Sequence, residues 1–168
     1  MENDPERLSS NKKVALRGCL IALAMILSYI ESFIPFFSSI PGIKLGLANI
    51  VTLYALEVLG LKDTLIISLL RIILSAILFG NPAMMIYSLS GALLSILVMK
   101  LLSGTGNFGL MGISVAGAVS HNAAQCVVAA VLLQNMSVIH YMPVLILSGI
   151  IAGLVTGTVS GAILRKVL

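Results

Sequence analysis

Charged residues are scarce in this chain. Asp, Glu, Lys and Arg make up 10% of its 168 residues and hydrophobic residues 59%, whereas soluble domains carry about 25% charged residues. This composition excludes a soluble globular protein and predicts an all-α, polytopic protein that contacts membrane lipid. A membrane span needs about 20 mainly apolar residues, so six spans use almost the whole chain and leave no room for an extramembrane catalytic domain.

Cysteine and histidine are also rare, with two residues of each. Cys19 and Cys126 both fall inside predicted spans, where we interpret them as small packing residues. Disulfide frameworks and structural metal sites need several such residues at suitable spacing. We therefore expect neither a disulfide nor a metal site, and no cofactor.

Six apolar segments are expected to cross the membrane as helices and to form one compact bundle. We place them at residues 14–34, 45–60, 61–79, 84–102, 110–133 and 141–164. The second is short, so it is expected to be tilted, broken or partly re-entrant. Residues 1–13 form a polar tail, and residues 14–168 form a single transmembrane domain. No small-residue cleavage site follows the first apolar run, so we expect that run to be retained.

Basic side chains predict the orientation in the membrane. With the N-terminus inside, Lys44 alone falls outside, while Arg71 lies within the membrane. Eight basic residues fall on the cytoplasmic side: Arg7, Lys12, Lys13, Arg17, Lys62, Lys100, Arg165 and Lys166. Because cytoplasmic loops carry this excess, we expect both termini in the cytoplasm and the protein in the inner (cytoplasmic) membrane. The net charge of +4 then reflects orientation and not nucleic-acid binding.

Small residues form two stripes that predict close helix packing, because such stripes let helix backbones approach in lipid. The last span carries four glycines at a four-residue interval: Gly149, Gly153, Gly157 and Gly161. We expect this stripe to be structural. The first span carries a shorter stripe near its cytoplasmic end: Ala15, Gly18 and Ala22. This second stripe is suited equally to contacts within the chain and to contacts with a partner.

Arg71 lies in the middle of the third span, where a guanidinium costs roughly 2.5 to 3.5 kcal/mol and cannot practically lose its proton. Ser68 and Ser75 share its helix face at three- and four-residue spacing and extend it into a polar stripe. One interpretation is a ligand-binding or water-filled site, because intramembrane charge usually marks function. The other is a structural ion pair, with Glu57 or, less favourably, with Glu31.

A second polar group lies in the fifth span, where His121, Asn122 and Gln125 are within about one turn of each other. Asn49 and Lys44 lie near the outer end of the second span. Together with the guanidinium, which can hold a carboxylate or phosphate in bidentate geometry, they could line an outward-facing site for an anionic or amphipathic molecule. Alternatively, the fifth-span residues form interhelical hydrogen bonds, and the lysine extends its amine to the membrane surface.

Two nucleotide-binding patterns are excluded. Gly104, Gly106 and Gly109 match G-x-G-x-x-G, but they occupy a short cytoplasmic loop without the preceding β-strand that a dinucleotide site requires. No G-x-x-x-x-G-K-[ST] occurs in the chain. Without a Walker loop, any ATP-driven transport needs another subunit.

Three runs resemble a known family: PGIKLGLANIVTLYAL at 41–56, LLRIILSAILFGNP at 69–82 and SVAGAVSHNAAQ at 114–125. The chain looks like the Gx transporter family, also called heptaprenyl diphosphate synthase component I, over roughly residues 15–164. The resemblance implies a relation to the substrate-binding S components of energy-coupling factor transporters, six-helix bundles that capture a micronutrient from outside. In those transporters, small residues of the first helix meet a coupling subunit with two attached ATPases, and Ala15, Gly18 and Ala22 are similar to that pattern.

The synthase name can be tested against the chemistry. Known prenyl diphosphate synthases hold magnesium with aspartate-rich D-D-x-x-D motifs, whereas this chain has only Asp4 and Asp63. We therefore expect no catalysis. The favoured interpretation is the substrate-binding subunit of a small-molecule uptake transporter. The alternatives are a non-catalytic accessory subunit of heptaprenyl diphosphate (isoprenoid or quinone) synthesis or of a redox complex, and a packing scaffold without a ligand.

Overall fold

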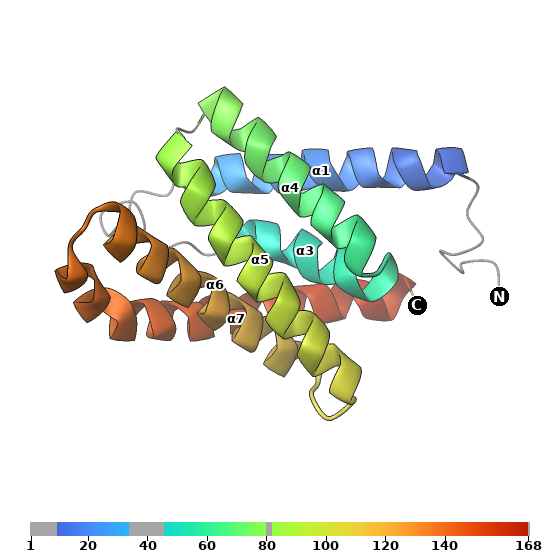
Figure 1. Ribbon diagram of the computed structural model, residues 1–168. Coiled ribbons are helices and arrows are strands. Elements are labelled where there is room, and N and C mark those ends of the chain that lie inside the picture. The colour runs from blue at the N-terminus through green and yellow to red at the C-terminus, as the bar shows by residue number, and fades with distance from the viewer. Residues whose placement is uncertain (1–9, 34–45, 80–81, 168) are drawn as a thin grey trace.

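The computed structural model describes residues 10–33, 46–79 and 82–167, which contain six α-helices and no strand (Figure 1). The α-helices are α1 (Ser10–Ser32), α3 (Leu47–Val58), α4 (Leu61–Phe79), α5 (Pro82–Thr105), α6 (Leu110–Leu132) and α7 (Met142–Val167). A 3₁₀ helix, η2 (Met136–Tyr141), precedes α7. The predicted all-α bundle of six helices is therefore confirmed.

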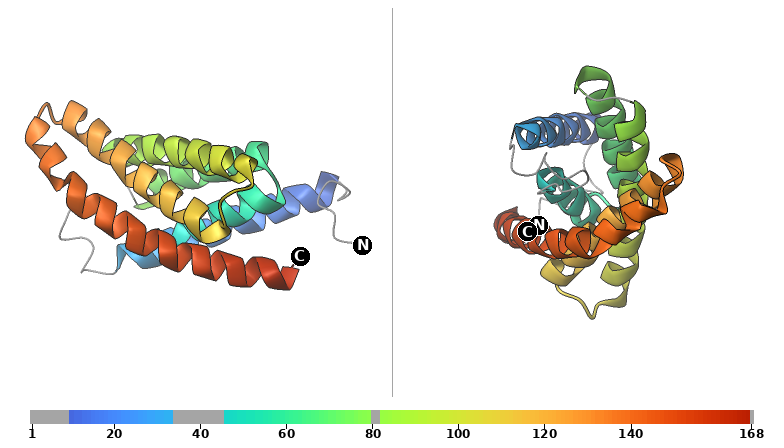
Figure 2. Two further views of the ribbon diagram at one scale, coloured as in Figure 1. Left: turned by 90° about the horizontal axis from the view of Figure 1, so that it is seen from below. Right: turned by 90° about the vertical axis from the view of Figure 1, so that its left-hand side faces the viewer.

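The bundle consists of two groups of three helices. In the first group, α1 packs against both α3 and α4. In the second, α6 lies between α5 and α7 and makes the most extensive contacts of the molecule with them. The groups meet where α4 packs on α5 and where α3 packs on α7. Figure 2 shows α3 enclosed between α1, α7 and the α4–α5 pair.

The short helix α3 supplies the centre of the bundle. Its 12 residues rise about 18 Å, which is less than the roughly 30 Å of a bilayer's hydrocarbon core. The second predicted span, residues 45–60, is thus shorter than expected as a helix. Half of the α3 residues are buried: Ala48, Val51, Thr52, Leu53, Ala55 and Leu56.

Opposite faces of α3 enter two hydrophobic clusters. The first cluster joins α1, α3 and α4 through Leu20, Ala24, Val51, Ala55 and Ile67. The second joins α3, α5 and α6 through Leu53, Leu56, Ile96, Met99 and Ile113. Because α3 is helical, its two pairs of residues point to different sides, and each side packs on one group of helices. The core therefore depends on this central helix.

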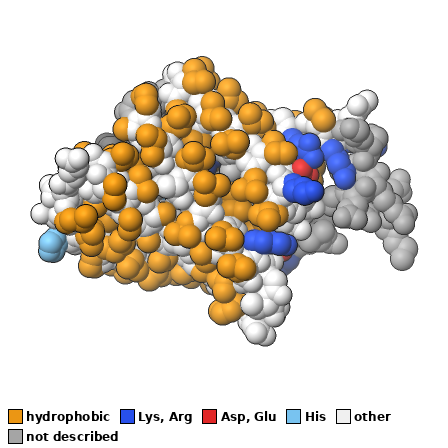
Figure 3. Space-filling model, in the orientation of Figure 1, with side chains coloured by type: hydrophobic (Ala, Val, Ile, Leu, Met, Phe, Trp, Pro, Cys, Tyr) orange, Lys and Arg blue, Asp and Glu red, His pale blue; other side chains and the backbone are white. Residues whose placement is uncertain are grey.

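The outside of the bundle suits a lipid environment. Four helical segments of the described chain are long and apolar enough to cross a membrane: Asn11–Glu31, Pro82–Thr105, Leu110–Leu132 and Met136–Lys166. Figure 3 shows hydrophobic side chains over most of one face, with Lys and Arg gathered at the end where α1 begins and α7 ends. The chain is a multi-pass membrane protein, and this charge distribution is the one that the predicted orientation requires.

The glycine stripe of α7 packs on α6. A Cβ atom at Gly153 would lie 2.5 Å from the Cα atom of Val115, and one at Gly149 would lie 3.1 Å from the Cα atom of Val119. Gly157 likewise approaches the backbone of Met111, whereas nothing lies within 4 Å at Gly161. The expected structural role therefore holds for the first three glycines of the stripe.

Candidate functional site

Arg71 points from α4 toward α1. Its Nη1 atom donates a hydrogen bond of 3.2 Å to Oγ of Ser28, and its guanidinium interacts electrostatically with the carboxylate of Glu31. Ser28 and Glu31 are three residues apart on α1, so they share one helix face. The structure thus surrounds the intramembrane guanidinium with polar groups of α1, which sequence reasoning had assigned only in part: Ser28 was missed.

A second polar contact links the same two helices at their other end. Nη2 of Arg17 on α1 lies 2.5 Å from Oδ1 of Asp63 in the first turn of α4. From this contact to the next is 11 residues along α1 and eight along α4, or about 16 Å and 12 Å of helix rise. The long side chain of Arg71 spans the difference of about 4 Å between these two rises. The parallel helices α1 and α4 are therefore held together at two levels.

Glu31 also caps the central helix. Its Oε1 atom accepts a hydrogen bond of 2.6 Å from the backbone N–H of Gly46, the N-cap residue of α3. Gly46 has a left-handed backbone (φ 70°) that favours glycine, and it has no side chain to cap the helix itself. The carboxylate is buried, with 8% of Glu31 exposed. Glu31 therefore serves two positive groups, the guanidinium and the N-terminus of α3.

Three polar atoms on one side of α4 are buried without a hydrogen-bond partner among the described residues: Nε of Arg71, Oγ of Ser68 and Oγ of Ser75. At about 100° per residue, both serines lie within about 60° of Arg71 around the helix axis. Buried polar atoms normally have partners, and each exception calls for an explanation. The atoms belong to one polar stripe, as the spacing predicted, so we treat it with Ser28 and Glu31 as one feature, the Arg71 cluster.

The sequence favoured Glu57 over Glu31 as the ion-pair partner of Arg71. The structure gives Glu57 a different partner. Glu57 is exposed near the end of α3, where its Oε1 atom accepts a hydrogen bond of 3.1 Å from Oγ of Ser103. It lies on the α3–α4 turn side, whereas Glu31, which interacts electrostatically with the guanidinium, lies at the opposite end of α3. The reason is helix direction: α3 runs antiparallel to α1 and carries Glu57 away from Arg71.

Two of the three predicted residues of α6 contact different neighbouring helices. The ring of His121 lies against Gly91 of α5, where a Cβ atom would approach three ring atoms to 2.9 Å. Nδ2 of Asn122 donates to the backbone oxygen of Leu145 on α7 at 2.9 Å. Gln125 is buried on the same helix. These contacts link α6 to α5 and α7, which fits the alternative of interhelical hydrogen bonds for Asn122.

Asn49 lies in the first turn of α3, close to the Arg71 cluster. Its backbone N–H donates to the oxygen of Gly46 at 2.8 Å, and its side-chain amide approaches the same residue. Lys44, the remaining predicted site residue, lies outside the described residues. Of the predicted set, Arg71 and Asn49 are therefore both linked to Glu31, Arg71 by charge and Asn49 through Gly46, whereas His121 and Asn122 contact α5 and α7.

The small-residue stripe of α1 faces away from the bundle. Ala15, Gly18 and Ala22 are all exposed, and nothing lies within 4 Å of a Cβ atom built at Gly18. Within the described ranges, no three His, Cys, Asp or Glu side chains are grouped so that they could hold a metal ion. The stripe thus remains uncovered by the described parts of this chain.

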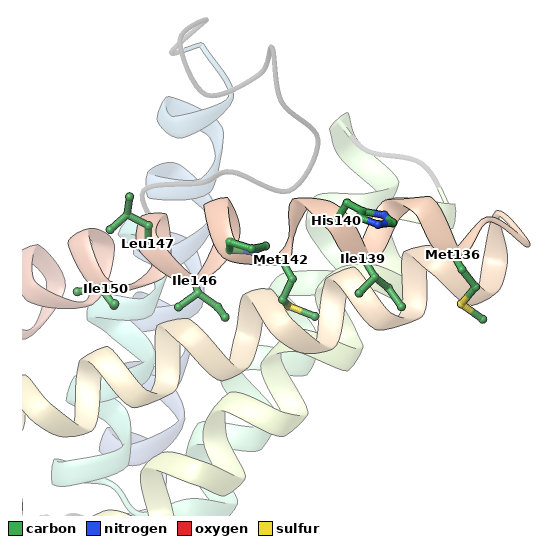
Figure 4. Close-up of a pocket in the computed structure, with 8 residues that line it drawn as sticks. Met136, Ile139, His140, Met142, Ile146, Leu147 and Ile150 are labelled. Carbon is green, nitrogen blue, oxygen red and sulfur yellow. The ribbon is translucent and has the colours of Figure 1, made fainter.

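An apolar groove occupies the outer end of the last two helical elements. Figure 4 shows its labelled side chains along η2 and α7. They are Met136, Ile139, His140, Met142, Ile146, Leu147 and Ile150. Their composition is that of a lipid-facing surface, and no predicted site residue lies among them.

Comparison with known proteins identifies one family. The model of the family described as heptaprenyl diphosphate synthase component I matches residues 20–163, which is most of the chain. No curated protein and no solved structure matches the sequence. The match covers α3, α4, α5 and α6 in full and α1 and α7 in part, and it includes Glu31, Arg71 and the three polar residues of α6.

Proposed function

The chain belongs to the heptaprenyl diphosphate synthase component I family, and from this membership we propose that it is a non-catalytic membrane subunit associated with heptaprenyl diphosphate synthesis. A protein described as one component works with another. The observation that carries the proposal is the exposed stripe of Ala15, Gly18 and Ala22 on α1, which offers a helix-packing surface to such a partner.

The two stripes of the chain support this role by their contrast. On α7, Gly149 and Gly153 pack on the backbone of α6, where an added Cβ atom would be tight at Gly149 (3.1 Å) and would clash at Gly153 (2.5 Å). On α1, Gly18 has open space where a Cβ atom would lie. Small residues gain van der Waals contact only when another helix approaches. A transmembrane helix of a partner subunit would use the α1 stripe as α6 uses that of α7.

The aspartates support a non-catalytic role. Prenyl diphosphate chemistry needs oxygen ligands that hold magnesium against the diphosphate, and the chain has two aspartates in all, Asp4 and Asp63. Asp63 is already engaged by Arg17 at the interface of α1 and α4. The catalytic groups of the synthase would therefore come from the other component.

The test is co-purification from native membranes in a mild detergent, followed by native mass spectrometry. We expect a prenyltransferase subunit to be retained. The variant Ala22→Leu, which fills the stripe, should release it, whereas Ala162→Leu, the same change at an exposed position of α7, should not. A complex with two ATPases and a coupling subunit would instead support an energy-coupled uptake transporter, and a redox subunit would contradict both functions.

A second function, capture of a small anion, is supported by a different observation. Within the described ranges, the buried atoms Arg71 Nε, Ser68 Oγ and Ser75 Oγ on one side of α4 have no hydrogen-bond partner. A guanidinium with free donors is suited to carboxylate or phosphate. This function would make the chain a substrate-binding subunit of a transporter, with His121, Asn122 and Gln125 of α6 and Asn49 and Lys44 of the α3 end as the further predicted binding residues.

This second function has its own test, the small molecules released from the purified protein. We expect an anionic metabolite in the wild type that Arg71→Lys loses, because an ammonium cannot copy the bidentate geometry of a guanidinium. The midpoint of thermal unfolding should change little in the same variant. Equal losses of binding and stability would assign Arg71 a structural role instead.

A further inference from the structure

The Arg71 cluster contains a negative charge of its own. Glu31 lies about one turn from Ser28, the residue that accepts a hydrogen bond from Arg71, and its buried carboxylate interacts electrostatically with the guanidinium. Any anion that binds to Arg71 therefore comes close to the carboxylate of Glu31, which already interacts with the guanidinium. Two like charges at one site of low dielectric repel each other strongly, so ligand and Glu31 compete for the guanidinium.

Glu31 keeps a second positive partner when an anion binds to the guanidinium of Arg71. Its Oε1 atom accepts the 2.6 Å hydrogen bond from the N–H of Gly46 at the start of α3. A helix N-terminus carries the equivalent of about half a positive charge. The carboxylate can therefore remain stabilised by α3 while Arg71 turns its donors to another anion.

The charges of the cluster limit what that anion can be. Arg71 contributes one positive charge, the α3 N-terminus about half of one, and Glu31 one negative charge. The surplus can attract one monoanion but cannot balance the several charges of a diphosphate. Ser28, Ser68 and Ser75 add hydroxyl groups suited to the oxygens of a carboxylate.

A carbon side chain next to the cluster indicates the rest of the ligand. Leu27 precedes Ser28 on α1, is only partly buried, and packs at the edge of the first hydrophobic cluster. An apolar body beside a single charged group would suit these surroundings, because burial of its carbon surface is favourable.

We infer that the Arg71 cluster is an exchange site for an apolar monocarboxylate, in which Glu31 is the internal counter-ion that the ligand displaces from Arg71 onto the N-terminus of α3. This inference rests on the anion-binding function proposed above and specifies its ligand class. It also excludes heptaprenyl diphosphate, or any other diphosphate, as the ligand of this site.

The experiment measures binding of radiolabelled benzoate to the full-length protein in detergent by equilibrium dialysis. Glu31→Gln removes the competing charge and should tighten binding about tenfold or more. The reason is that the guanidinium of Arg71 is then available to benzoate without first losing its interaction with a carboxylate. Glu57→Gln is the matched control, since it removes the same charge from an exposed position. It should bind as the wild type does. Arg71→Gln should abolish binding.

Folding of the key variant can be checked separately. A glutamine at position 31 retains an Oε1 acceptor for the N–H of Gly46, so the cap of α3 is preserved. Thermal unfolding should therefore give a cooperative transition for Glu31→Gln. As a direct readout at the site, the nitrogen-15 resonance of Arg71 Nε, identified by its loss in Arg71→Gln, should shift on addition of benzoate.

The opposing outcomes are distinct. Wild-type benzoate binding that needs Arg71 but is unchanged by Glu31→Gln would overturn the exchange and leave the anion-binding function intact. Binding by no folded variant would overturn both. Inorganic pyrophosphate that binds more tightly than benzoate would overturn the ligand class. Retention of a prenyltransferase tests the accessory function independently of all three results.

Discussion

Single glycine residues set how closely α6 approaches its two neighbours. Gly153 brings α7 onto the backbone of α6 at Val115, and Gly91 brings α5 onto the ring of His121. The two contacts differ in what they meet. A backbone cannot move aside without shifting a helix, whereas a ring can change its rotamer. The same substitution, glycine to alanine, should therefore have different consequences at the two positions.

Gly153→Ala should destabilise the protein by about 1 to 3 kcal/mol, the usual cost of inserting a methyl group into a filled interface. The new Cβ would lie 2.5 Å from Cα of Val115, so α6 and α7 must separate. Gly161→Ala is the matched control, since it belongs to the same stripe and meets nothing within 4 Å. Reversible unfolding in mixed detergent gives both free energies. Equal values for the two variants would refute the packing argument.

Gly91→Ala should perturb the position of His121, because the new methyl group would lie 2.9 Å from three ring atoms. The loss should be relieved when His121→Ala is added, so a double-mutant cycle should give a coupling free energy of about 0.5 to 3 kcal/mol. Additive effects of the two substitutions would mean that the ring does not lie on Gly91.

At the scale of elements, α1 is the helix most lightly attached to the bundle. It contacts α3 and α4 but has no extensive contact with the second group of helices. Its polar contacts with α4 lie at two levels, Arg17 with Asp63 and Ser28 with Arg71. The same helix presents the small-residue stripe outward. A partner docked on α1 would therefore touch an element that is held to α4 by these two polar contacts and to the start of α3 by the hydrogen bond between Glu31 and Gly46.

Asp63→Asn should destabilise the attachment of α1 by about 1 to 3 kcal/mol, which is less than for a fully buried pair. The side chain of Arg17 keeps 31% of its surface exposed and that of Asp63 keeps 12%. Lys62→Gln, at the exposed neighbouring position, serves as the control and should change stability by less than about 0.5 kcal/mol. Unfolding free energies in detergent check both values. An unchanged free energy of unfolding in Asp63→Asn would show that the ion pair contributes nothing to stability.

At the scale of the whole molecule, charge and topology agree. The start of α1 and the end of α7 lie at one end of the bundle, as an even number of crossings requires, and basic side chains gather there (Figures 1 and 3). The cytoplasmic side carries such an excess in most membrane proteins. The loop between α5 and α6 should therefore face the cytoplasm, and η2 the outside.

Labelling with a membrane-impermeant maleimide tests this orientation in intact cells. In a background with Cys19→Ser and Cys126→Ser, a cysteine introduced by Ser137→Cys in η2 should react from outside. The same introduction by Asn107→Cys, in the loop between α5 and α6, should react only after the cells are opened. Both positions are exposed. Reversed reactivity would invert the orientation, and the proposed binding site would then open to the cytoplasm.

The amino-acid sequence by itself determined the fold class and the polar stripe. Apolar length and scarcity of charge identify a multi-pass membrane protein of six helices, because a bilayer admits few other structures, and four helical segments of the described chain are long and apolar enough to cross a membrane. Helical periodicity placed Ser68, Arg71 and Ser75 on one face, and the four-residue glycine interval identified the packing surface of α7. These features depend on neighbours along the chain, which the sequence contains in full.

The tertiary structure decided what each feature meets. It placed Glu31, and not Glu57, where it interacts with Arg71, and it directed Asn122 of α6 to the backbone of α7. It closed the α7 stripe on α6 and left the α1 stripe open. Helix order and direction set these pairings, and they follow from packing all six helices around α3 at once. Local periodicity cannot supply that information, since each helix face fits several neighbours equally well.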